Sequence, residues 1–287
     1  MISVIIITYN RKLLLEKTVD SILTQDAGEK FEIVIVDNGS SDGTAEYVRK
    51  KYPEKVKLIR NKNRISLSAC KELGVSTAGG EITAFIDDDC VASENWLKNI
   101  KKALPDYDFL AGPVLALADT RFPWWWKNSL DWLIGINPKP DKKFPPLGSN
   151  IAFKKSVFNA SGLKDNNLLL PYAEDRIRIA KLLNAGFSMC INQGMIVYHY
   201  IPLKRLEIAY LIKRSYNEGL ASSVLERNPK TAILNILGLI INPLRLILFI
   251  DINYFFRIIA NLSYLFNLII PGFQRHRNQN HSCISCP

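Results

Sequence analysis

Three consecutive carboxylates directly follow a short apolar run, Ile82–Ile86; they are Asp87, Asp88 and Asp89. An apolar run rich in β-branched and aromatic residues is typical of a buried strand. Such a strand ends in acids only where its tip meets water or a cation, and ligands of open α/β sheets collect at the carboxyl ends of strands. The triplet therefore indicates a site for a hard divalent cation that carries an anionic ligand such as a pyrophosphate. The alternative is an acidic turn with solvated side chains.

A second group of chemically capable residues lies later in the chain. Glu174 and Asp175 open a predicted helix that stops at Gly186, and His199 ends a short predicted strand, Ile196–His199. Acids in the first turn of a helix are favoured by the helix dipole alone, so a purely structural role stays open for both. Histidine is a common metal ligand and can change its charge near neutral pH, which makes His199 a candidate ligand.

The elements that must position these residues alternate between strand and helix. Strands are predicted at Ser3–Thr8, Phe31–Asp37, Val56–Arg60 and Ile82–Ile86, and a helix follows each of them. This alternation predicts a doubly wound, mostly parallel α/β sheet. Two strands end in acid at the same edge, so a nucleotide lying across it would place its base near Asp37 and its phosphates near Asp89. No Gly-x-Gly-x-x-Gly or P-loop motif occurs, which argues against a dehydrogenase and a P-loop NTPase.

The sequence also predicts where two helices begin or end and which face of a third helix is apolar. The helix that begins at Leu67 is expected to end at Gly74, and Ser93 is expected to cap the helix that carries Trp96. In the helix after Asp175, one face is expected to carry Ile177, Ala180 and Leu183.

The segment from Leu115 to Leu147 is aromatic and proline-rich. It is predicted to be a long loop with one helix, around Lys127–Ile134. Loops of this length inside a domain are usually lids or binding loops. Trp124, in the run Phe122–Trp126, could stack on a sugar ring, sit at a membrane interface, or pack beneath the loop.

Charge is uneven along the 287 residues. The net charge is +10, and the stretch from Tyr200 to the end holds ten basic and only four acidic residues. A basic excess beside apolar sequence favours an anionic membrane surface as a partner. No recognisable nucleic-acid module is present, so no nucleic-acid partner is expected.

Cysteine usage indicates a compartment. The five cysteines are an odd number, and Met1 leads directly into a predicted strand rather than a secretory leader. Both features favour a reducing, cytosolic environment. Cys283 and Cys286 have zinc-knuckle spacing but no second cysteine pair, so we expect a polar tail rather than a metal site.

Several segments together resemble the family 2 glycosyltransferases, which have the GT-A fold and transfer a sugar from a nucleotide diphosphate sugar. The resemblance covers roughly residues 1–226. It rests on Ser3–Arg11, Val36–Thr44, Phe85–Asp89, Gly148–Asn150 with Phe153, Glu174–Asp175, and His199. Each motif alone is weak, but their shared order and spacing are specific.

The resemblance assigns roles to residues of this sequence. It implies that the nucleotide is bordered by Thr8, Tyr9, Asn10, Asp37 and Asn38, with Asp88 facing the ribose or base. Asp87 and Asp89 become the outer acids of a metal-binding Asp-x-Asp motif for Mn²⁺ or Mg²⁺, and His199 an additional metal or phosphate contact. Asp175 becomes the catalytic base with Glu174 beside it. The acceptor side would be lined by Gly148, Ser149, Asn150 and Trp124.

The sequence departs from the family pattern in three places. Asn38 stands where many members have a second aspartate, which makes the donor base less certain. Lys71 stands in the segment where the family usually has Ala-Arg-Asn-x-Gly; it either replaces the arginine near the phosphates or is a solvated lysine. The Gln-x-x-Arg-Trp motif of polymer-making members is absent, which favours transfer of a single sugar.

The C-terminal third is predicted to be helical. A helix at Leu206–Leu225 precedes two apolar runs, Ala232–Ile250 and Ile252–Ile270, which contain Arg245 and Arg257. A central arginine costs about 2.5–3.5 kcal/mol on membrane insertion. We therefore expect a pair of helices lying in the plane of the membrane interface rather than two spans; packing on the catalytic domain or a second subunit is the alternative.

These expectations define three regions and one function. Residues 1–226 form a transferase domain (nucleotide half 1–114, acceptor half 115–226), residues 227–271 a membrane-associating helix pair, and residues 272–287 a polar tail. The predicted function is metal-dependent, inverting transfer of one sugar from a nucleotide diphosphate sugar to a glycan or lipid-linked acceptor. It serves cell-surface polysaccharide or glycoconjugate synthesis, peripherally on the cytoplasmic face of the membrane. A degenerate membrane-bound scaffold and a nucleotide-sugar-forming nucleotidyltransferase are the alternatives. The sugar, nucleotide, acceptor, linkage and oligomeric state, a homo-oligomer included, stay open.

Overall fold

The computed structural model describes residues 1–28, 30–117, 120–140, 146–161, 174–225, 229–249 and 252–269. The chain divides into two compact units. The first comprises Met1–Arg121, Gly135–Asn166 and Asp175–Ile201, and the second Phe122–Ile134, Asn167–Glu174 and Pro202–Pro287. This division groups the helix Ile208–Leu225 with the helices after it, whereas the sequence places a boundary after residue 226. The predicted polar tail, residues 272–287, lies outside the described residues.

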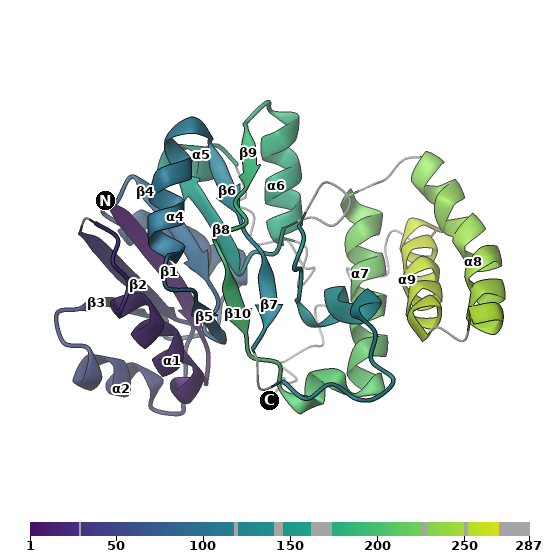
Figure 1. Cartoon of the computed structure of the whole chain (residues 1–287), viewed down its shortest axis with the longest axis horizontal. Coiled ribbons are helices and arrows are strands. Elements are labelled where there is room, and N and C mark those ends of the chain that lie inside the picture. Colours follow the sequence, from purple (N-terminus) through teal and green to yellow (C-terminus); the bar gives the residue numbers. More distant parts are fainter. Residues whose placement is uncertain are drawn as a thin grey trace. The chain divides into compact units, whose positions relative to one another are not determined.

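A seven-stranded sheet with the order β3-β2-β1-β4-β8-β6-β9 organises the first unit (Figure 1). Its strands are β1 (Ile2–Thr8), β2 (Phe31–Asp37), β3 (Val56–Arg60), β4 (Ile82–Ile86), β6 (Phe109–Ala111), β8 (Asn150–Lys154) and β9 (Met189–Ile191). Strands β1 to β4 pair in parallel, and β8 runs antiparallel to both β4 and β6. The predicted mostly parallel sheet is confirmed. A smaller sheet has the order β5 (Cys90–Ala92), β10 (Val197–His199) and β7 (Val114–Ala116).

Helices cover both faces of the large sheet. The helices of this unit are α1 (Lys12–Leu23), α2 (Thr44–Lys51), α3 (Leu67–Thr77), α4 (Trp96–Ala103), α5 (Lys155–Ala160) and α6 (Glu174–Asn184). Alternate side chains of β1 enter opposite cores: Val4 packs in the cluster that contains Leu15 of α1, and Ile5 in the cluster that contains Val75 of α3. A strand buried on both faces needs apolar residues at every position, which explains its near-continuous apolar sequence.

Three details of the helices differ from expectation. Helix α3 does not end at Gly74 but continues to Thr77, and a Cβ on Gly74 would lie 2.6 Å from Ile5 Cγ2. The glycine is therefore a close-packing position rather than a stop signal. Asn95, not Ser93, is the N-cap of α4, and no side-chain hydrogen bond caps the helix. In α6, Leu183 is exposed, whereas Ile179 and Leu182 are buried.

The second unit is helical in its described part. It contains the 3₁₀ helices η2 (Asn128–Ile134) and η3 (Leu203–Leu206) and the helices α7 (Ile208–Leu225), α8 (Pro229–Phe249) and α9 (Ile252–Ile269). Helix α9 packs against both α7 and α8 (Figure 1). Glycines permit close approach at both contacts: a Cβ on Gly219 would lie 2.0 Å from the Ala260 carbonyl oxygen, and one on Gly238 2.1 Å from Asn261 Nδ2. The two predicted C-terminal helices are confirmed.

In these helices several polar side chains are buried and several apolar ones are exposed, the opposite of the usual arrangement in a soluble protein. Polar residues are buried, namely Ser215, Ser223, Asn242, Asn253 and Ser263. Large aliphatic residues on α8 are exposed, namely Ile233, Leu234, Ile236, Leu237, Ile240 and Ile241. Among the described residues, none of the helices combines the length and the apolar character that crossing a membrane requires.

Candidate active site

The aspartate triplet lies at the carboxyl end of β4, as its sequence predicts. Asp88 and Asp89 are buried, whereas Asp87 is exposed. Arg11, just after β1, donates from Nη1 to Asp88 Oδ1 at 2.8 Å and to Asp89 Oδ2 at 2.9 Å. Burial raises the pKa of Asp88 to about 6 although Arg11 opposes the rise. The pKa of Asp87 is raised as well, because nearby protein atoms exclude part of the water around its carboxyl group and because Asp89 is negatively charged.

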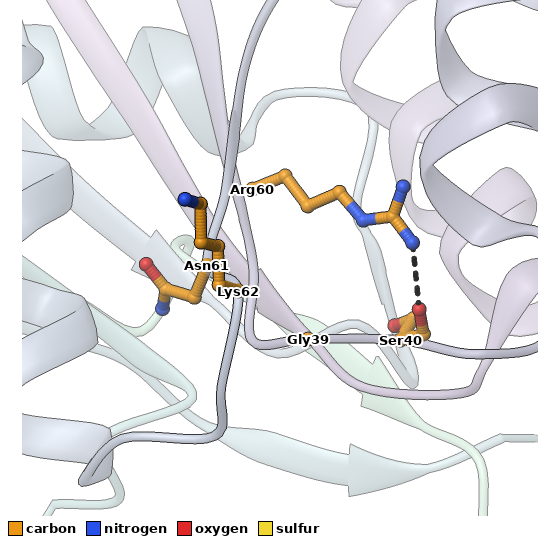
Figure 2. A pocket seen from close by; sticks show the side chains of 5 residues that line it. All are labelled: Gly39, Ser40, Arg60, Asn61 and Lys62. Carbon is orange, nitrogen blue, oxygen red and sulfur yellow. Dashed lines mark hydrogen bonds between the residues drawn. The ribbon is translucent and has the colours of Figure 1, made fainter.

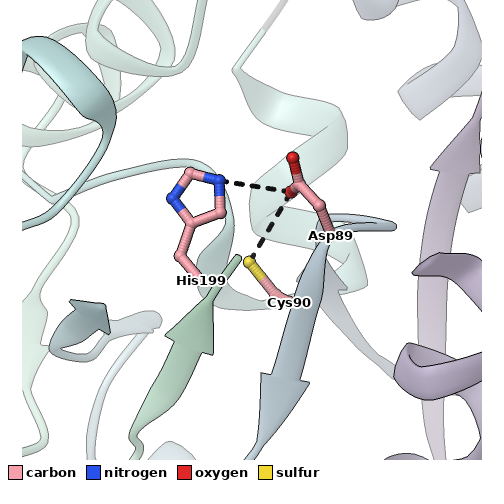
Figure 3. Close-up of side chains that lie close together, drawn as sticks. All are labelled: Asp89, Cys90 and His199. Carbon is pink, nitrogen blue, oxygen red and sulfur yellow. Dashed lines mark hydrogen bonds and ion pairs between the residues drawn. The ribbon is translucent and has the colours of Figure 1, made fainter. Parts of the chain in front are cut away.

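The small sheet brings His199 to Asp89 (Figure 3). His199 on β10 is directly opposite Cys90 on β5, and His199 Nε2 lies 3.3 Å from Asp89 Oδ1. Cys90 Sγ lies 3.9 Å from the same oxygen. One ligand atom from each of these three residues falls within 4.8 Å of the others.

The environment of His199 fits a cation. Its Nδ1 lies 3.1 Å from the Gly135 carbonyl oxygen, so the tautomer that donates from Nδ1 satisfies this contact. The lone pair of Nε2 then faces a carboxylate oxygen of Asp89, and two acceptors at this distance require a proton or a metal between them. Carboxylate and imidazole are ligands that Mn²⁺ accepts, and a backbone partner on the second nitrogen is common for metal-binding histidines.

Asp175 lies in the first turn of α6. Its Oδ1 is 2.5 Å from Lys71 Nζ, and a Cβ on Gly148 would lie 1.7 Å from its Oδ2. Lys71 is buried, so the interpretation of this residue as a solvated lysine is wrong. Gly148, predicted on the acceptor side, makes room for the Asp175 carboxylate.

A pocket lies at the carboxyl ends of β2 and β3 (Figure 2). It has a volume of about 290 Å³ and is lined by Gly39, Ser40, Arg60, Asn61 and Lys62. Beside it, Asp37 is fully buried and its Oδ1 accepts a hydrogen bond from the Ser40 amide at 2.9 Å. Among the described residues no hydrogen bond reaches Asp37 Oδ2, which lies 3.8 Å from Arg60 Nε. This oxygen is itself buried, so the residues that line the pocket, and not Asp37, face the space that a ligand could occupy.

The other residues predicted around the nucleotide hold loops together. Asn38 accepts hydrogen bonds from the Ile65 amide at 2.9 Å and from Asn61 Nδ2 at 3.1 Å, and it donates to the Ile65 carbonyl at 2.9 Å. Its side-chain amide therefore ties the loop after β3 to the end of β2.

The residues at the end of β1 and just after it also contact neighbouring loops. Thr8 is buried, and its carbonyl accepts from the Asn38 amide at 2.9 Å. Asn10 has a left-handed backbone, with φ of 53°, and accepts from the Ser41 amide at 2.8 Å. The Tyr9 ring lies 4.4 Å below the Arg64 guanidinium.

A comparison with known families decides the identity. The model of the family described as glycosyl transferase family 2 matches residues 3–165, more than half of the chain. The chain belongs to this family. Its relatives by sequence include a glucuronosyltransferase and a glucosyltransferase, and the protein is an enzyme of this transferase class.

Two relatives illustrate the range of similarity. A glucosyl-dolichyl phosphate glucuronosyltransferase of Haloferax volcanii is 26% identical over 245 residues, which are 78% of this chain and 77% of the relative. A GalNAc(5)-diNAcBac-PP-undecaprenol beta-1,3-glucosyltransferase of Campylobacter jejuni is 38% identical over 91 residues, 31% of this chain and only 29% of the relative. The transferase therefore spans most of the first protein but matches less than a third of the second.

A solved structure confirms the GT-A-type fold. It is a mannosyltransferase from Pyrobaculum calidifontis in complex with GDP-Man and Mn²⁺. The TM-score is 0.59 at 20% identity, and the match covers 98% of this transferase and 76% of that chain.

Four of the predicted site residues are either buried or belong to the second unit. Asn150, expected to contact the acceptor, is fully buried: it accepts from Trp96 Nε1 at 2.8 Å and donates to the carbonyls of Pro113 and Met195 at 2.8 and 2.6 Å. It therefore holds the core together instead of facing a substrate. Its neighbour Ser149 is also buried. Trp124, which is 96% exposed, and Glu174, which is buried, belong to the second unit, and their predicted roles stay predictions.

Sequence reasoning missed one contributor to the site, Arg11, and two residues near it, Cys90 and Glu72. In the sequence, Arg11 stands out only as the last residue of a motif. Its position just after β1, a strand that pairs with β4 and its acidic end, could have indicated the contact. Cys90 follows the triplet directly, but only the pairing of β5 with β10 places it beside His199. Glu72 has no signal in the sequence, because its ion pair with Arg178 joins two helices distant in the chain.

Proposed function

We propose that this glycosyltransferase is a metal-dependent, inverting enzyme that moves one sugar from a nucleotide diphosphate sugar to a glycan or lipid-linked acceptor. One observation supports this most: the Asp89–His199 pair, the carboxylate of Asp175 and the pocket beside Asp37 all belong to one compact unit. An acidic cation site, a base and a nucleotide-sized edge are the parts that direct sugar transfer requires.

The metal would be held by Asp89 and His199, with Asp87 as a further oxygen ligand. When bound, a divalent ion supplies Lewis-acid stabilisation of the charge that develops on the leaving diphosphate. Arg11 holds Asp89 Oδ2, so it fixes the orientation of this carboxylate. The Mn²⁺ in the Pyrobaculum mannosyltransferase complex lends support to this assignment.

Asp175 is the proposed base. Its carboxylate takes the proton from the acceptor hydroxyl while that oxygen bonds to the anomeric carbon, and the bond between this carbon and the β-phosphate oxygen breaks. The nucleoside diphosphate leaves with the bonding electrons from the face opposite the attack. A single base and a single displacement imply inversion at the anomeric carbon.

The nucleotide would lie along the ends of β1, β2 and β3. Ser40, Arg60 and Lys62 line the pocket there, with Asp37 buried beside it, and the loop that Asn38 ties down borders the same pocket. We assign Thr8, Tyr9 and Asn10 to the frame of this subsite, because their described contacts hold its loops.

The acceptor is proposed to be membrane-linked. The Haloferax and Campylobacter relatives are named for sugars carried on dolichyl phosphate and on PP-undecaprenol. The exposed aliphatic side chains of α8 and the basic excess after Tyr200 suit a peripheral position on the cytoplasmic face of a membrane. A role in cell-surface polysaccharide or glycoconjugate synthesis would follow.

Calorimetric binding tests this function directly. UDP, GDP and dTDP are titrated into the protein with and without Mn²⁺, and into Asp89→Asn and Asp175→Asn. We expect one diphosphate to bind in a Mn²⁺-dependent manner, with this binding lost in Asp89→Asn and kept in Asp175→Asn, which loses transfer instead. Binding of no diphosphate, or equal binding without metal, would contradict the proposal.

A further inference from the structure

Helices α3 and α6 are joined by two ion pairs of opposite polarity. Lys71 and its neighbour Glu72 on α3 face Asp175 and Arg178 on α6. Lys71 Nζ lies 2.5 Å from Asp175 Oδ1, and Arg178 Nη2 lies 3.0 Å from Glu72 Oε1. Two consecutive residues of one helix thus meet residues one turn apart on the other.

The first pair has an inner and an outer partner. The Lys71 side chain is only 6% exposed and its ammonium lies 5.8 Å from the centre of the Phe85 ring, whereas the Asp175 side chain is 24% exposed. A buried ammonium is costly unless an opposite charge compensates it, so the burial of Lys71 favours its ion pair with Asp175. The carboxylate keeps access to solvent and therefore to a substrate.

Both oxygens of the Asp175 carboxylate have a close neighbour. Lys71 holds Oδ1, and Oδ2 lies so close to Gly148 that no side chain fits there. We propose that Lys71 is the positioning residue of the catalytic base rather than a contact of the donor diphosphate. This inference rests on the proposed role of Asp175 and adds to it the group that orients the carboxylate.

The second pair anchors α6 without Lys71. The Arg178 side chain is buried, its guanidinium lies 3.8 Å from the centre of the Phe158 ring, and it also donates to Ser161 Oγ. Because α6 keeps this anchor, removing the Lys71 charge changes the orientation of Asp175 more than the position of the helix. Glu72 thus offers a matched control on the same two helices.

The experiment compares Lys71→Met, Lys71→Arg and Glu72→Gln with the wild type. Steady-state rates with the donor identified by calorimetry give kcat and KM, and calorimetry gives the Kd of the nucleoside diphosphate. We expect Lys71→Met to lower kcat about 100-fold, the size typical of a misplaced reacting group, with the diphosphate Kd within about threefold of wild type. Lys71→Arg should recover part of kcat. Glu72→Gln should lower the melting temperature and keep kcat within about threefold.

Two results would overturn the inference. A diphosphate Kd weakened tenfold or more in Lys71→Met, with kcat near wild type, would make Lys71 a donor contact. Equal losses of kcat in Lys71→Met and Glu72→Gln would make both pairs merely structural. If Lys71→Met does not fold, Lys71→Gln is judged by the same criteria. Full activity of Asp175→Asn would instead refute the proposed base, whatever Lys71 does.

Discussion

The two oxygens of Asp89 have different neighbours, Arg11 on one side and His199 on the other. The guanidinium can only donate, so it fixes one oxygen whatever the state of the site. The imidazole nitrogen is an acceptor in the tautomer that donates to Gly135, so the second oxygen and this nitrogen together favour a cation. The metal site would therefore be asymmetric, with its affinity dependent on His199.

Mn²⁺ binding is expected to depend on His199 and not on Cys90. His199→Ala removes a nitrogen ligand and should weaken Mn²⁺ binding about 10- to 100-fold, as loss of a ligand or its support commonly does. Cys90→Ala should stay within about threefold, because Mn²⁺ prefers oxygen and nitrogen to thiolate ligands. Electron paramagnetic resonance of free Mn²⁺ measures both. Equal weakening by the two variants would contradict the assignment.

Gly148→Ala is expected to displace the base. The added Cβ would overlap the Asp175 carboxylate, and a misplacement of about 1 Å can lower a rate roughly 100-fold. The kcat should fall while the diphosphate Kd is unchanged. Gly79→Ala is the control, since its Cβ would meet no atom closer than 3.4 Å. A Gly148→Ala enzyme with wild-type kcat would show that Asp175 needs no such placement.

Single residues were predictable to different degrees. The pairing of Asp89 with His199 could be expected, because both end strands and the family resemblance places them at one site. The contacts of Asn38 and Asn150 could not be expected, because an amide can serve a ligand or a loop equally well in the sequence. Their partners, Ile65 and Met195, come from loops whose paths the hydrophobic pattern does not describe.

At the scale of elements, Glu32 joins the amino ends of three strands. Its carboxylate accepts from Ser3 Oγ and the Gly79 amide, each at 2.5 Å, and lies 2.7 Å from Lys57 Nζ. Burial alone would raise the pKa of Glu32, but the hydrogen bonds from Lys57, Ser3 and Gly79 lower it below its ordinary value. A lowered pKa in the folded state stabilises the protein above the unfolded pKa, and this contribution is lost as the pH falls through the folded value.

Glu32→Gln should therefore destabilise the protein in a pH-dependent way. At pH 7 we expect a loss of about 1–3 kcal/mol in the free energy of unfolding. The difference from wild type should shrink below about pH 4, where glutamate of the unfolded chain is protonated. Urea unfolding at both pH values measures this. The exposed pair Glu46–Arg60 gives the control: Glu46→Gln should change stability little at either pH.

Elements were predicted best where burial alone decides the pattern. The strands β1, β2 and β4 are largely buried apolar runs, so their positions could be predicted within about one residue. The ends of helices were harder to predict. Gly74, for example, looks like a stop signal but allows close packing against Ile5. The buried face of α6 was also misassigned at Leu183, because a helix of mixed composition offers more than one apolar stripe.

At the scale of the whole molecule, α8 exposes a stripe that suits a lipid surface. Between Lys230 and Arg245 the sequence has no charged residue, which is too short an uncharged stretch for a span but enough for a helix in the interface. Asn242 of the same helix is buried while Ile236 and Ile240 are exposed. A soluble surface normally shows the opposite distribution.

Replacing Ile236 and Ile240 by Glu is expected to abolish binding to vesicles that contain phosphatidylglycerol. The wild type should float with such vesicles. The partition coefficient of the double variant should be at least about tenfold lower, because charged residues insert poorly. Leu13→Glu, at an exposed leucine of α1, should float like the wild type. A wild-type dimer that the double variant converts to a monomer would instead show that a second copy covers α8.

The antiparallel strand β8 has a consequence for synthesis of the chain. Strands β1 to β4 are complete at Ile86, but the free edge of β4 pairs with β8, which is finished only at Lys154. Until then a growing chain presents an unpaired, apolar strand edge, the feature that most readily recruits other chains. Premature termination between these two points should yield a product that aggregates, and protection of this edge by a chaperone would be needed for as long as the ribosome takes to reach β8.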